Sequence, residues 1–263
     1  MKKIGVIGAG NMGGALIKGW STLDGVSIIA YDINKDRLSE VVNNYGVEKA
    51  EDIEQAIKGS NIVLLAVKPN QVKGLLERYK DCFNTKQIIV SICAGIKIKK
   101  IGKWSNDRCK VVRIMPNTPA LVDRGMFAIC FGDGILEEDR GLILSLFSSL
   151  GKVFEMEEKY MDAYTALIGS GPAYIIYFLE ALVESGVSMG FPRDMSIEMV
   201  KGLLSGTTKM VEEIDMKLSE FREMVTSPGG TTIAALNHFD RMAFRGIIID
   251  AVEKACKRSK ELA

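Results

Sequence analysis

The N-terminal stretch Ile4-Gly-Val-Ile-Gly-Ala-Gly-Asn-Met-Gly-Gly14 decides the fold, because it runs an apolar strand into three spaced glycines and then into a helix. Its glycines fit the pattern G-x-G-x-x-G. The first permits a tight turn, the second lets a diphosphate approach the backbone, and the third lets the helix pack closely on the strand. Free N–H groups at the start of that helix favour an anion. The stretch predicts a dinucleotide-binding turn, and the alternative is a glycine-rich turn without a ligand. The predicted contacts are Gly8, Ala9, Gly10, Asn11, Met12 and Gly13.

Length and composition indicate a globular protein. The 263 residues suffice for one large domain or two of modest size. Lys and Arg number 34 against 33 Asp and Glu, so no bulk charge attracts nucleic acid or an anionic membrane. The five cysteines are odd in number and scattered, which favours reduced thiols in a cytoplasmic protein over disulfides or a zinc site. The longest apolar stretch, 166–183, contains glycines, a proline and a glutamate, so we expect a helix buried against protein and no membrane span.

Strands alternate with helices through the first 157 residues. The patterns predict strands at 4–7, 26–31, 61–67, 87–91 and 110–115, and helices at 11–23, 35–45 and 53–57. They also predict antiparallel edge strands at 126–131 and 153–155, with a helix at 136–149 between them. Continuous apolar runs such as 61–67 are typical of strands buried on both faces. The fold class expected is α/β, with a Rossmann-type, doubly wound, mostly parallel sheet.

An acidic residue, Asp32, directly follows the second predicted strand, which covers 26–31. It comes 19 residues after Gly13. An acidic side chain there can accept hydrogen bonds from an adenosine ribose, and it repels a 2′-phosphate. However, Asn34, Lys35 and Arg37 follow at once and could hold a phosphate. Both NAD and NADP therefore stay open as cofactors. The alternative role for Asp32 is to cap the next helix.

Two later strand ends also carry candidate cofactor contacts, because ligands of such sheets lie beyond the carboxyl ends of the strands. These residues are Ala66, Val67, Lys68, Pro69, Ile92, Cys93 and Ala94. The alternative for the first group is an ordinary turn with a solvated lysine. Cys93 has no base near it in sequence, which favours a small apolar filler over a reactive thiol. After the strand at 110–115, two prolines predict a fixed loop at 116–120.

The alternation ends near Glu157, and the remainder reads as helix. One long apolar helix is expected at 164–189, and others at 197–214, 221–225, 231–239 and 244–260. Helices that are hydrophobic on several faces need a partner surface, so we expect a homodimer. The expected domains are a dinucleotide-binding domain at 1–157 and an all-α dimerisation and substrate domain at 158–263.

A second candidate site lies at Thr226-Ser-Pro-Gly-Gly-Thr-Thr-Ile233, which breaks one helix and starts another. The backbone amides of such a loop can converge on an anion, and two hydroxyls open the next helix. A small carboxylate would suit this loop, and the alternative is a plain helix cap. His238, the only histidine, reads as a surface imidazole, and no histidine–carboxylate cluster points to a metal.

Five segments together resemble the pyrroline-5-carboxylate reductase family. They are Ile7-Gly-Ala-Gly-Asn-Met-Gly13, Ala66-Val-Lys-Pro69, Arg113-Ile-Met-Pro-Asn-Thr-Pro119, Ile168-Gly-Ser-Gly-Pro-Ala-Tyr174 and Val225-Thr-Ser-Pro-Gly-Gly-Thr-Thr232. They span nearly the whole chain in the family's order, and the last two are the more specific. The resemblance implies reduction of the cyclic imine 1-pyrroline-5-carboxylate to L-proline with NADPH or NADH, the final step of proline biosynthesis. It also implies a homodimer, and pentamers of such dimers occur in the family.

The resemblance also implies roles for particular residues. The loop 227–232 would hold the substrate carboxylate, and Thr232 is the catalytic candidate, bonding the ring nitrogen directly or through a water. The segment 115–117 would form a wall against the nicotinamide, and Glu158 aligns loosely with a substrate-side glutamate. An imine nitrogen is basic enough to be protonated before or during hydride transfer, so a strong general acid is not obligatory. The implied substrate contacts are Met115, Pro116, Asn117, Glu158, Ser227, Gly229, Gly230, Thr231 and Thr232.

Two positions depart from the family pattern, and two other functions compete. Before the segment Ala66-Val-Lys-Pro69, where family members often carry an asparagine, this chain has Ile53 beside Asp52. Shortly before the loop 227–232, where some members carry an asparagine, it has Met224. A β-hydroxyacid dehydrogenase shares the glycine-rich start, but it carries a catalytic lysine on the long helix, where 169–174 has none. A non-catalytic dinucleotide-binding sensor is the other alternative, and the loop 227–232 argues against it.

Overall fold

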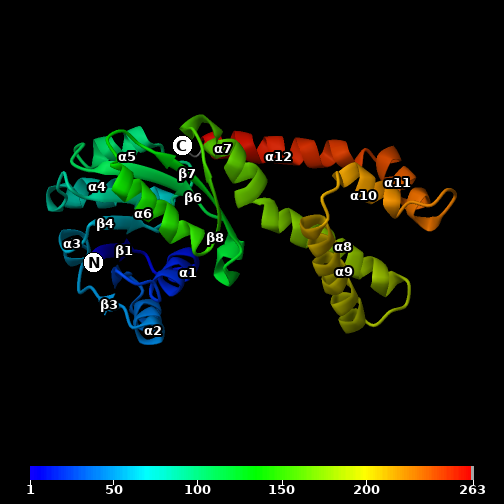
Figure 1. Ribbon diagram of the computed structural model, residues 1–263, viewed down its shortest axis with the longest axis horizontal. Coiled ribbons are helices and arrows are strands. Elements are labelled where there is room, and N and C mark those ends of the chain that lie inside the picture. The colour runs from blue at the N-terminus through cyan, green and yellow to red at the C-terminus, as the bar shows by residue number, and fades with distance from the viewer. Residues whose placement is uncertain (262–263) are drawn as a thin grey trace. The chain divides into compact units, whose positions relative to one another are not determined.

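The computed structural model describes residues 1–261 (Figure 1). The chain divides into two compact units. The first comprises Met1–Pro172 together with residues 255–261, and the second comprises Ala173–Lys254. The first contains the sheet and the second consists of helices, which is the predicted order of an α/β part followed by an all-α part.

One sheet in the order β3-β2-β1-β4-β5-β6-β7-β8 forms the centre of the first unit. Its strands are β1 (Lys2–Ile7), β2 (Val26–Tyr31), β3 (Glu48–Lys49), β4 (Ile62–Leu65), β5 (Ile88–Ser91), β6 (Lys110–Met115), β7 (Gly125–Phe131) and β8 (Gly151–Glu155). Strands β1 to β6 pair in parallel, β7 runs antiparallel to β6, and β8 is parallel to β7. The mostly parallel sheet and its two reversed strands were predicted; the two-residue β3 was not. Strand order reverses between β1 and β4, where ligands of such sheets bind.

Helices cover both faces of this sheet. They are α1 (Asn11–Trp20), α2 (Lys35–Tyr45), α3 (Ile53–Lys58), α4 (Pro69–Tyr79), α5 (Ile98–Trp104) and α6 (Glu137–Ser148), with the short turns η1 (Lys80–Cys82), η2 (Thr118–Val122) and η3 (Glu158–Tyr160). Helix α1 ends three residues earlier than expected, and part of the predicted loop 116–120 is the helical turn η2. Asn34 caps α2 by accepting the Arg37 N–H, and Gly46, with φ of 65°, ends it.

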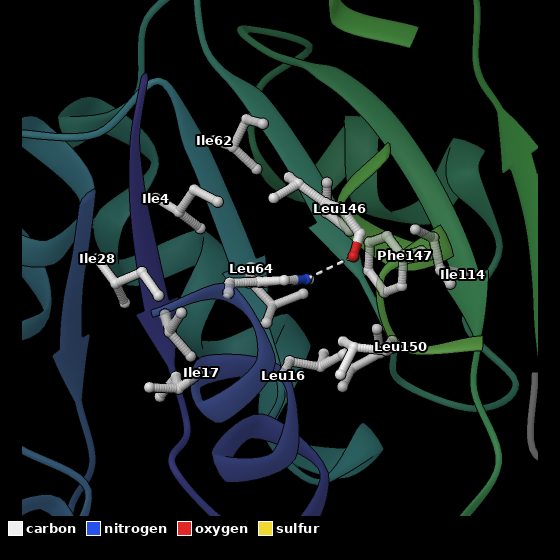
Figure 2. Close-up of a cluster of buried hydrophobic side chains, with 14 of the residues drawn as sticks. Ile4, Leu16, Ile17, Ile28, Ile62, Leu64, Ile114, Leu146, Phe147 and Leu150 are labelled. Atoms are coloured by element: carbon white, nitrogen blue, oxygen red, sulfur yellow. Dashed lines mark hydrogen bonds between the residues drawn. The ribbon is translucent and has the colours of Figure 1, made fainter. Parts of the chain in front are cut away.

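Two hydrophobic layers result, one on each face. Leu16, Leu38 and Phe147 bring α1, α2 and α6 onto one face, while Ile57, Leu76 and Ile101 do the same for α3, α4 and α5 on the other. Figure 2 shows the first layer, in which the Trp20 indole N–H donates to the Leu146 carbonyl at 2.8 Å. A buried indole donor is thereby satisfied, and α1 is tied to α6.

The prediction of one continuous helix over 164–189 is wrong. The chain forms α7 (Met161–Tyr164), a π-helical turn η4 (Thr165–Gly169) and then α8 (Gly171–Ser188). Pro172 lacks a backbone N–H and cannot sit inside an uninterrupted α-helix, so the first helix ends before it and a new α-helix begins at Gly171. The apolar composition of the stretch masked this break.

The second unit contains most of α8 together with α9 (Arg193–Glu213), α10 (Leu218–Met224), α11 (Thr231–Arg241) and the start of α12 (Phe244–Glu261). Large apolar side chains stay exposed on it, among them Ile176, Tyr177 and Ile249. By length and composition alone, the stretch Glu158–Ser188 could cross a membrane, and little of it is buried within the protomer. An exposed apolar surface of this size on helices requires a covering partner.

Candidate active site

The glycine-rich turn after β1 has the geometry that its sequence predicts. A Cβ on Gly8, whose φ is +104°, would lie 2.5 Å from the Ala66 carbonyl oxygen, and one on Gly13 would lie 2.0 Å from the Gly8 carbonyl oxygen. A Cβ on Gly10 would meet nothing within 4 Å. In the described part of the chain no side chain caps α1, so the N–H groups of its first turn are open to an anion. This turn therefore fits a dinucleotide diphosphate.

Asp32 ties the end of β2 to the glycine turn. One carboxylate oxygen accepts the Ala9 N–H at 2.6 Å and the other accepts the Asn34 N–H at 2.7 Å. Asn34, not Asp32, caps α2, so the cap alternative for Asp32 is wrong. Arg37 donates to the side chains of Asn11 and Glu40, which holds it beside the turn. Ribose contact by Asp32 stays a prediction.

A hollow of about 280 Å³ gathers residues from the ends of β4, β5 and β6, the start of α1 and the π-helical turn. Its lining residues are Met12, Ala66, Val67, Ile92, Met115, Pro116, Asn117, Thr118 and Gly169. Seven of these nine were predicted as cofactor or substrate contacts. Thr118 and Gly169 were missed, although both stand inside the quoted family segments. The hollow is mostly apolar with a few polar groups, which suits a flat ring such as nicotinamide.

The remaining strand-end residues divide into exposed and buried ones. Lys68 and Pro69 are exposed at the start of α4. The Cys93 thiol is buried and lies 3.2 Å from the Val67 carbonyl and 3.4 Å from that of Leu65. Burial raises the pKa of this thiol to about 11. Cys93 is therefore a neutral, packed side chain, and the preference for a small filler over a reactive thiol is confirmed.

Glu158 lies at the partly exposed edge of an ion cluster in the first unit, in which Arg113 is buried. Its carboxylate accepts the Ile98 N–H at 2.8 Å and pairs with Arg113 at 3.1 Å. Arg113 is 3% exposed and also lies 3.9 Å from Asp162, which accepts the Ser259 hydroxyl. The spacing of the sequence gave no signal for this cluster. A substrate contact by Glu158 stays a prediction.

The loop before α11 forms the second candidate site, in the second unit. The Gly230 N–H donates to the Ser227 carbonyl at 3.1 Å, and Gly229 has φ of 67°, which only glycine adopts without strain. Helix α11 starts at Thr231 with no side-chain cap in the described chain, so its first N–H groups are open to a carboxylate. Thr232 is half-buried in its first turn, and His238 is exposed, as expected.

The sheet and the glycine turn are typical of a dinucleotide-dependent oxidoreductase, and the unit that follows is helical. Comparisons with known proteins identify the family. Residues 158–262 match the family model described as pyrroline-5-carboxylate reductase dimerisation, and residues 3–95 match that of NADP oxidoreductase, coenzyme F420-dependent. The pyrroline-5-carboxylate reductase of Pisum sativum is 36% identical over 263 residues, covering 99% of this chain and 96% of the relative. That of Escherichia coli is 32% identical over 266 residues, covering 100% and 98%.

Solved structures agree with these relatives. The pyrroline-5-carboxylate reductase of Coxiella burnetii superposes with a TM-score of 0.91 at 31% identity, covering 100% of this chain and 98% of that one. The Plasmodium falciparum pyrroline carboxylate reductase, solved with NADP bound, gives 0.90 at 31% identity, covering 99% and 98%. The chain belongs to the pyrroline-5-carboxylate reductase family. This membership decides against the hydroxyacid dehydrogenase alternative.

Proposed function

We propose that this protein reduces 1-pyrroline-5-carboxylate to L-proline, the final step of proline biosynthesis, with NADPH or NADH as the hydride donor. The observation that carries the proposal is identity of 36% to a pyrroline-5-carboxylate reductase along 99% of the chain. Two features of the chain support it as well: a turn with room for a dinucleotide diphosphate, and a helix start with no side-chain cap that would suit a carboxylate.

The cofactor, when bound, supplies a hydride to the imine carbon. The turn from Gly8 to Gly13 would bind its diphosphate, and Asp32 would contact its adenosine ribose. Residues 66–69 and 92–94 would flank it at the strand ends. The hollow lined by Met12 and Met115 would seat the nicotinamide. These residues align the cofactor and exclude water, which is the main contribution of a protein to hydride transfer.

The substrate carboxylate would bind the open N–H groups at the start of α11, within the loop from Ser227 to Thr232. A helix N-terminus stabilises a carboxylate by about 0.3–1 kcal/mol, and by up to about 2 kcal/mol in a partly buried site. The Thr232 hydroxyl would bond the ring nitrogen, directly or through a water. Met115, Pro116 and Asn117 would form the wall of the pocket, and Glu158 would lie on the substrate side. The imine nitrogen carries the proton, and the hydride adds to the adjacent carbon.

The domain limits and the assembly are part of the same proposal. Residues 1–157 would form the dinucleotide-binding domain and residues 158–263 the dimerisation and substrate domain. The match of 158–262 to the dimerisation model supports this division. The dimers would assemble further as pentamers of dimers in the cytoplasm. The scattered, unpaired cysteines support a reducing compartment.

The test is oxidation of NADPH and NADH by the purified protein, followed by the absorbance of the reduced nicotinamide, with and without pyrroline-5-carboxylate. Oxidation that requires the imine supports the proposal. Thr232→Ala should lower kcat by about tenfold or more. The control Thr85→Ala, at an exposed position distant in sequence from Thr232, should leave kcat unchanged. No oxidation of either cofactor by a folded dimer would leave the non-catalytic dinucleotide-binding alternative in its place, and oxidation that does not require the imine would contradict the proposed substrate.

A further inference from the structure

One wall of the 280 Å³ hollow forms where two segments distant in sequence meet. Met115 is the last residue of β6, the residues to Thr118 follow it, and Gly169 ends the π-helical turn η4. A Cβ on Gly169 would lie 3.0 Å from the Met115 Cε and 4.0 Å from its Cγ. The position of η4 therefore sets how far Met115 reaches into the hollow.

Pro172 denies one backbone carbonyl, that of Ile168, its ordinary α-helical donor. The Ser170 N–H bonds the Thr165 carbonyl at 2.9 Å, five residues back, which is the π-helical pattern. In an α-helix the Ile168 carbonyl would accept the N–H of residue 172. That residue is Pro172, which has no N–H. A buried carbonyl left without a donor costs about 1–3 kcal/mol.

Asn117 supplies the missing donor. Its side-chain oxygen accepts the Met126 N–H at 2.8 Å, and its Nδ2 donates to the Ile168 carbonyl at 3.4 Å. The Met126 contact fixes the orientation of the amide, because only the oxygen can accept. Asn117 is 6% exposed and both of its hydrogen bonds are partly buried, which limits competition from water.

We propose that Asn117 is a positioning residue that replaces the hydrogen bond lost at Pro172 and thereby holds η4 against the nicotinamide wall. Through the Ile168 carbonyl it fixes Gly169, and through Gly169 it fixes Met115. The proposal rests on the proposed function in that the hollow receives a nicotinamide. It predicts that Asn117 governs binding of the nicotinamide end of the cofactor and leaves the adenine end, which is bound at the glycine turn, unaffected.

The first test is Asn117→Asp, which keeps an acceptor for the Met126 N–H and removes the donor to Ile168. Dissociation constants are measured for NADH, NADPH and ADP-ribose, which lacks the nicotinamide, by fluorescence and calorimetry. We expect both dinucleotides to bind about tenfold more weakly and ADP-ribose to bind within twofold of wild type. Asn43→Asp, which adds the same charge at an exposed position of α2, should change none of the three constants. Equal weakening of all three ligands, or of none, would overturn the proposal.

The second test uses Pro172→Ala, which gives residue 172 an N–H for the Ile168 carbonyl. In this background the effect of Asn117→Asp on NADH binding should shrink from about tenfold to less than threefold. An undiminished effect would show that Asn117 does not serve that carbonyl. A defect that only destabilised the fold would persist in both backgrounds.

Gly169→Ala reaches the same wall from the other side and does not alter Asn117. Its Cβ would press on the flexible end of Met115, so dinucleotide binding should weaken several-fold while ADP-ribose binding is kept. Unchanged dinucleotide binding would contradict the role of Gly169. All of these readouts are binding constants, so they stand apart from whether the protein turns over the imine, which tests the proposed function.

Discussion

Gly10 and Gly13 lie three residues apart in one turn, yet they act in different ways. A Cβ on Gly13 would lie 2.0 Å from the Gly8 carbonyl oxygen, closer than any real contact. A Cβ on Gly10 would face open space, where a diphosphate fits. One glycine is therefore required by the protein's own packing and the other by its ligand.

Alanine substitutions separate these two requirements. Gly13→Ala should destabilise the fold by about 1–3 kcal/mol, because the backbone must move, and should weaken cofactor binding as well. Gly10→Ala should keep the stability within about 1 kcal/mol and weaken NADPH and NADH binding by more than tenfold. Urea unfolding and fluorescence titration measure the two effects. Gly74→Ala is the control, because a Cβ on Gly74 in α4 would meet nothing within 4 Å. It should lower neither the free energy of unfolding nor the affinity for the cofactor. Tight cofactor binding by the Gly10 variant would show that the diphosphate lies elsewhere.

The Cys93 thiol provides a prediction about pH. Its pKa is raised to about 11, so at pH 8 only about one thiol in a thousand is ionised. The raised pKa means that the neutral thiol stabilises the fold below the ordinary thiol pKa, and that this contribution disappears as the pH rises through about 11. Iodoacetamide at pH 8 should label the half-exposed Cys82 and leave Cys93 unmodified until urea unfolds the protein. Peptide mass mapping measures both. Labelling of native Cys93 at the rate of Cys82 would refute its burial.

At the scale of elements, the end of α12 is held in the first unit by a buried hydrogen bond. Ser259 donates to Asp162 at 2.8 Å, and Asp162 lies 3.9 Å from Arg113, which also pairs with Glu158. The bond joins α12 to α7, and the ion pairs join α7 and η3 to β6. A buried charge that keeps all its partners is tolerated, whereas the loss of one partner is costly.

Ser259→Ala should therefore lower the free energy of unfolding by about 1–3 kcal/mol, because the Asp162 carboxylate loses a buried donor. Urea denaturation of the dimer at constant protein concentration measures the change. Ser39→Ala, on the exposed face of α2, should cost less than about 0.5 kcal/mol. A cost for Ser259→Ala no larger than that of Ser39→Ala would mean that this contact contributes nothing to stability.

At the scale of the whole molecule, the apolar side chains exposed on the helical unit explain why the chain dimerises. Ile176 and Ile249 are 57% and 59% exposed in the protomer, and the residues around them match a dimerisation domain. Burial of such side chains contributes about 25 cal/mol per Å². The stretch Glu158–Ser188, which contains Ile176, is also long and apolar enough to cross a membrane, because a subunit interface and a membrane span both consist of side chains that avoid water.

Ile176→Glu should place an unpaired charge in that interface and shift the protein from dimer to monomer. Sedimentation velocity across a hundredfold range of concentration measures the change. Leu136→Glu, an exposed apolar position at the start of α6, is the matched control and should stay dimeric. A dimer of undiminished affinity in the Ile176 variant would place the interface on other residues.

The sequence alone was enough for the order of the long strands and for the glycine turn, but it did not predict the two-residue β3. Residues 61–67 predicted a strand because a continuous apolar run suits a strand buried on both faces, and Gly13 predicted close packing because no other residue fits. Helices α4 and α5 were not delimited, although α4 is as long as the predicted α2 and Pro69 at its first position marks its start. The break in the long apolar helix was missed, although Pro172 marked it.

What the sequence by itself determined was whatever depends on neighbours in the chain: helix starts, turns, strand burial and the segments that identify the family. Only the tertiary structure decided which distant groups meet. It joined Asn117 to the Ile168 carbonyl, Asp32 to the Ala9 N–H, and Arg113 to Glu158. Steric limits on the backbone act within a few residues, so they can be recognised in a short segment. A buried polar group takes whichever partner packing brings within reach, and no spacing along the chain specifies that partner.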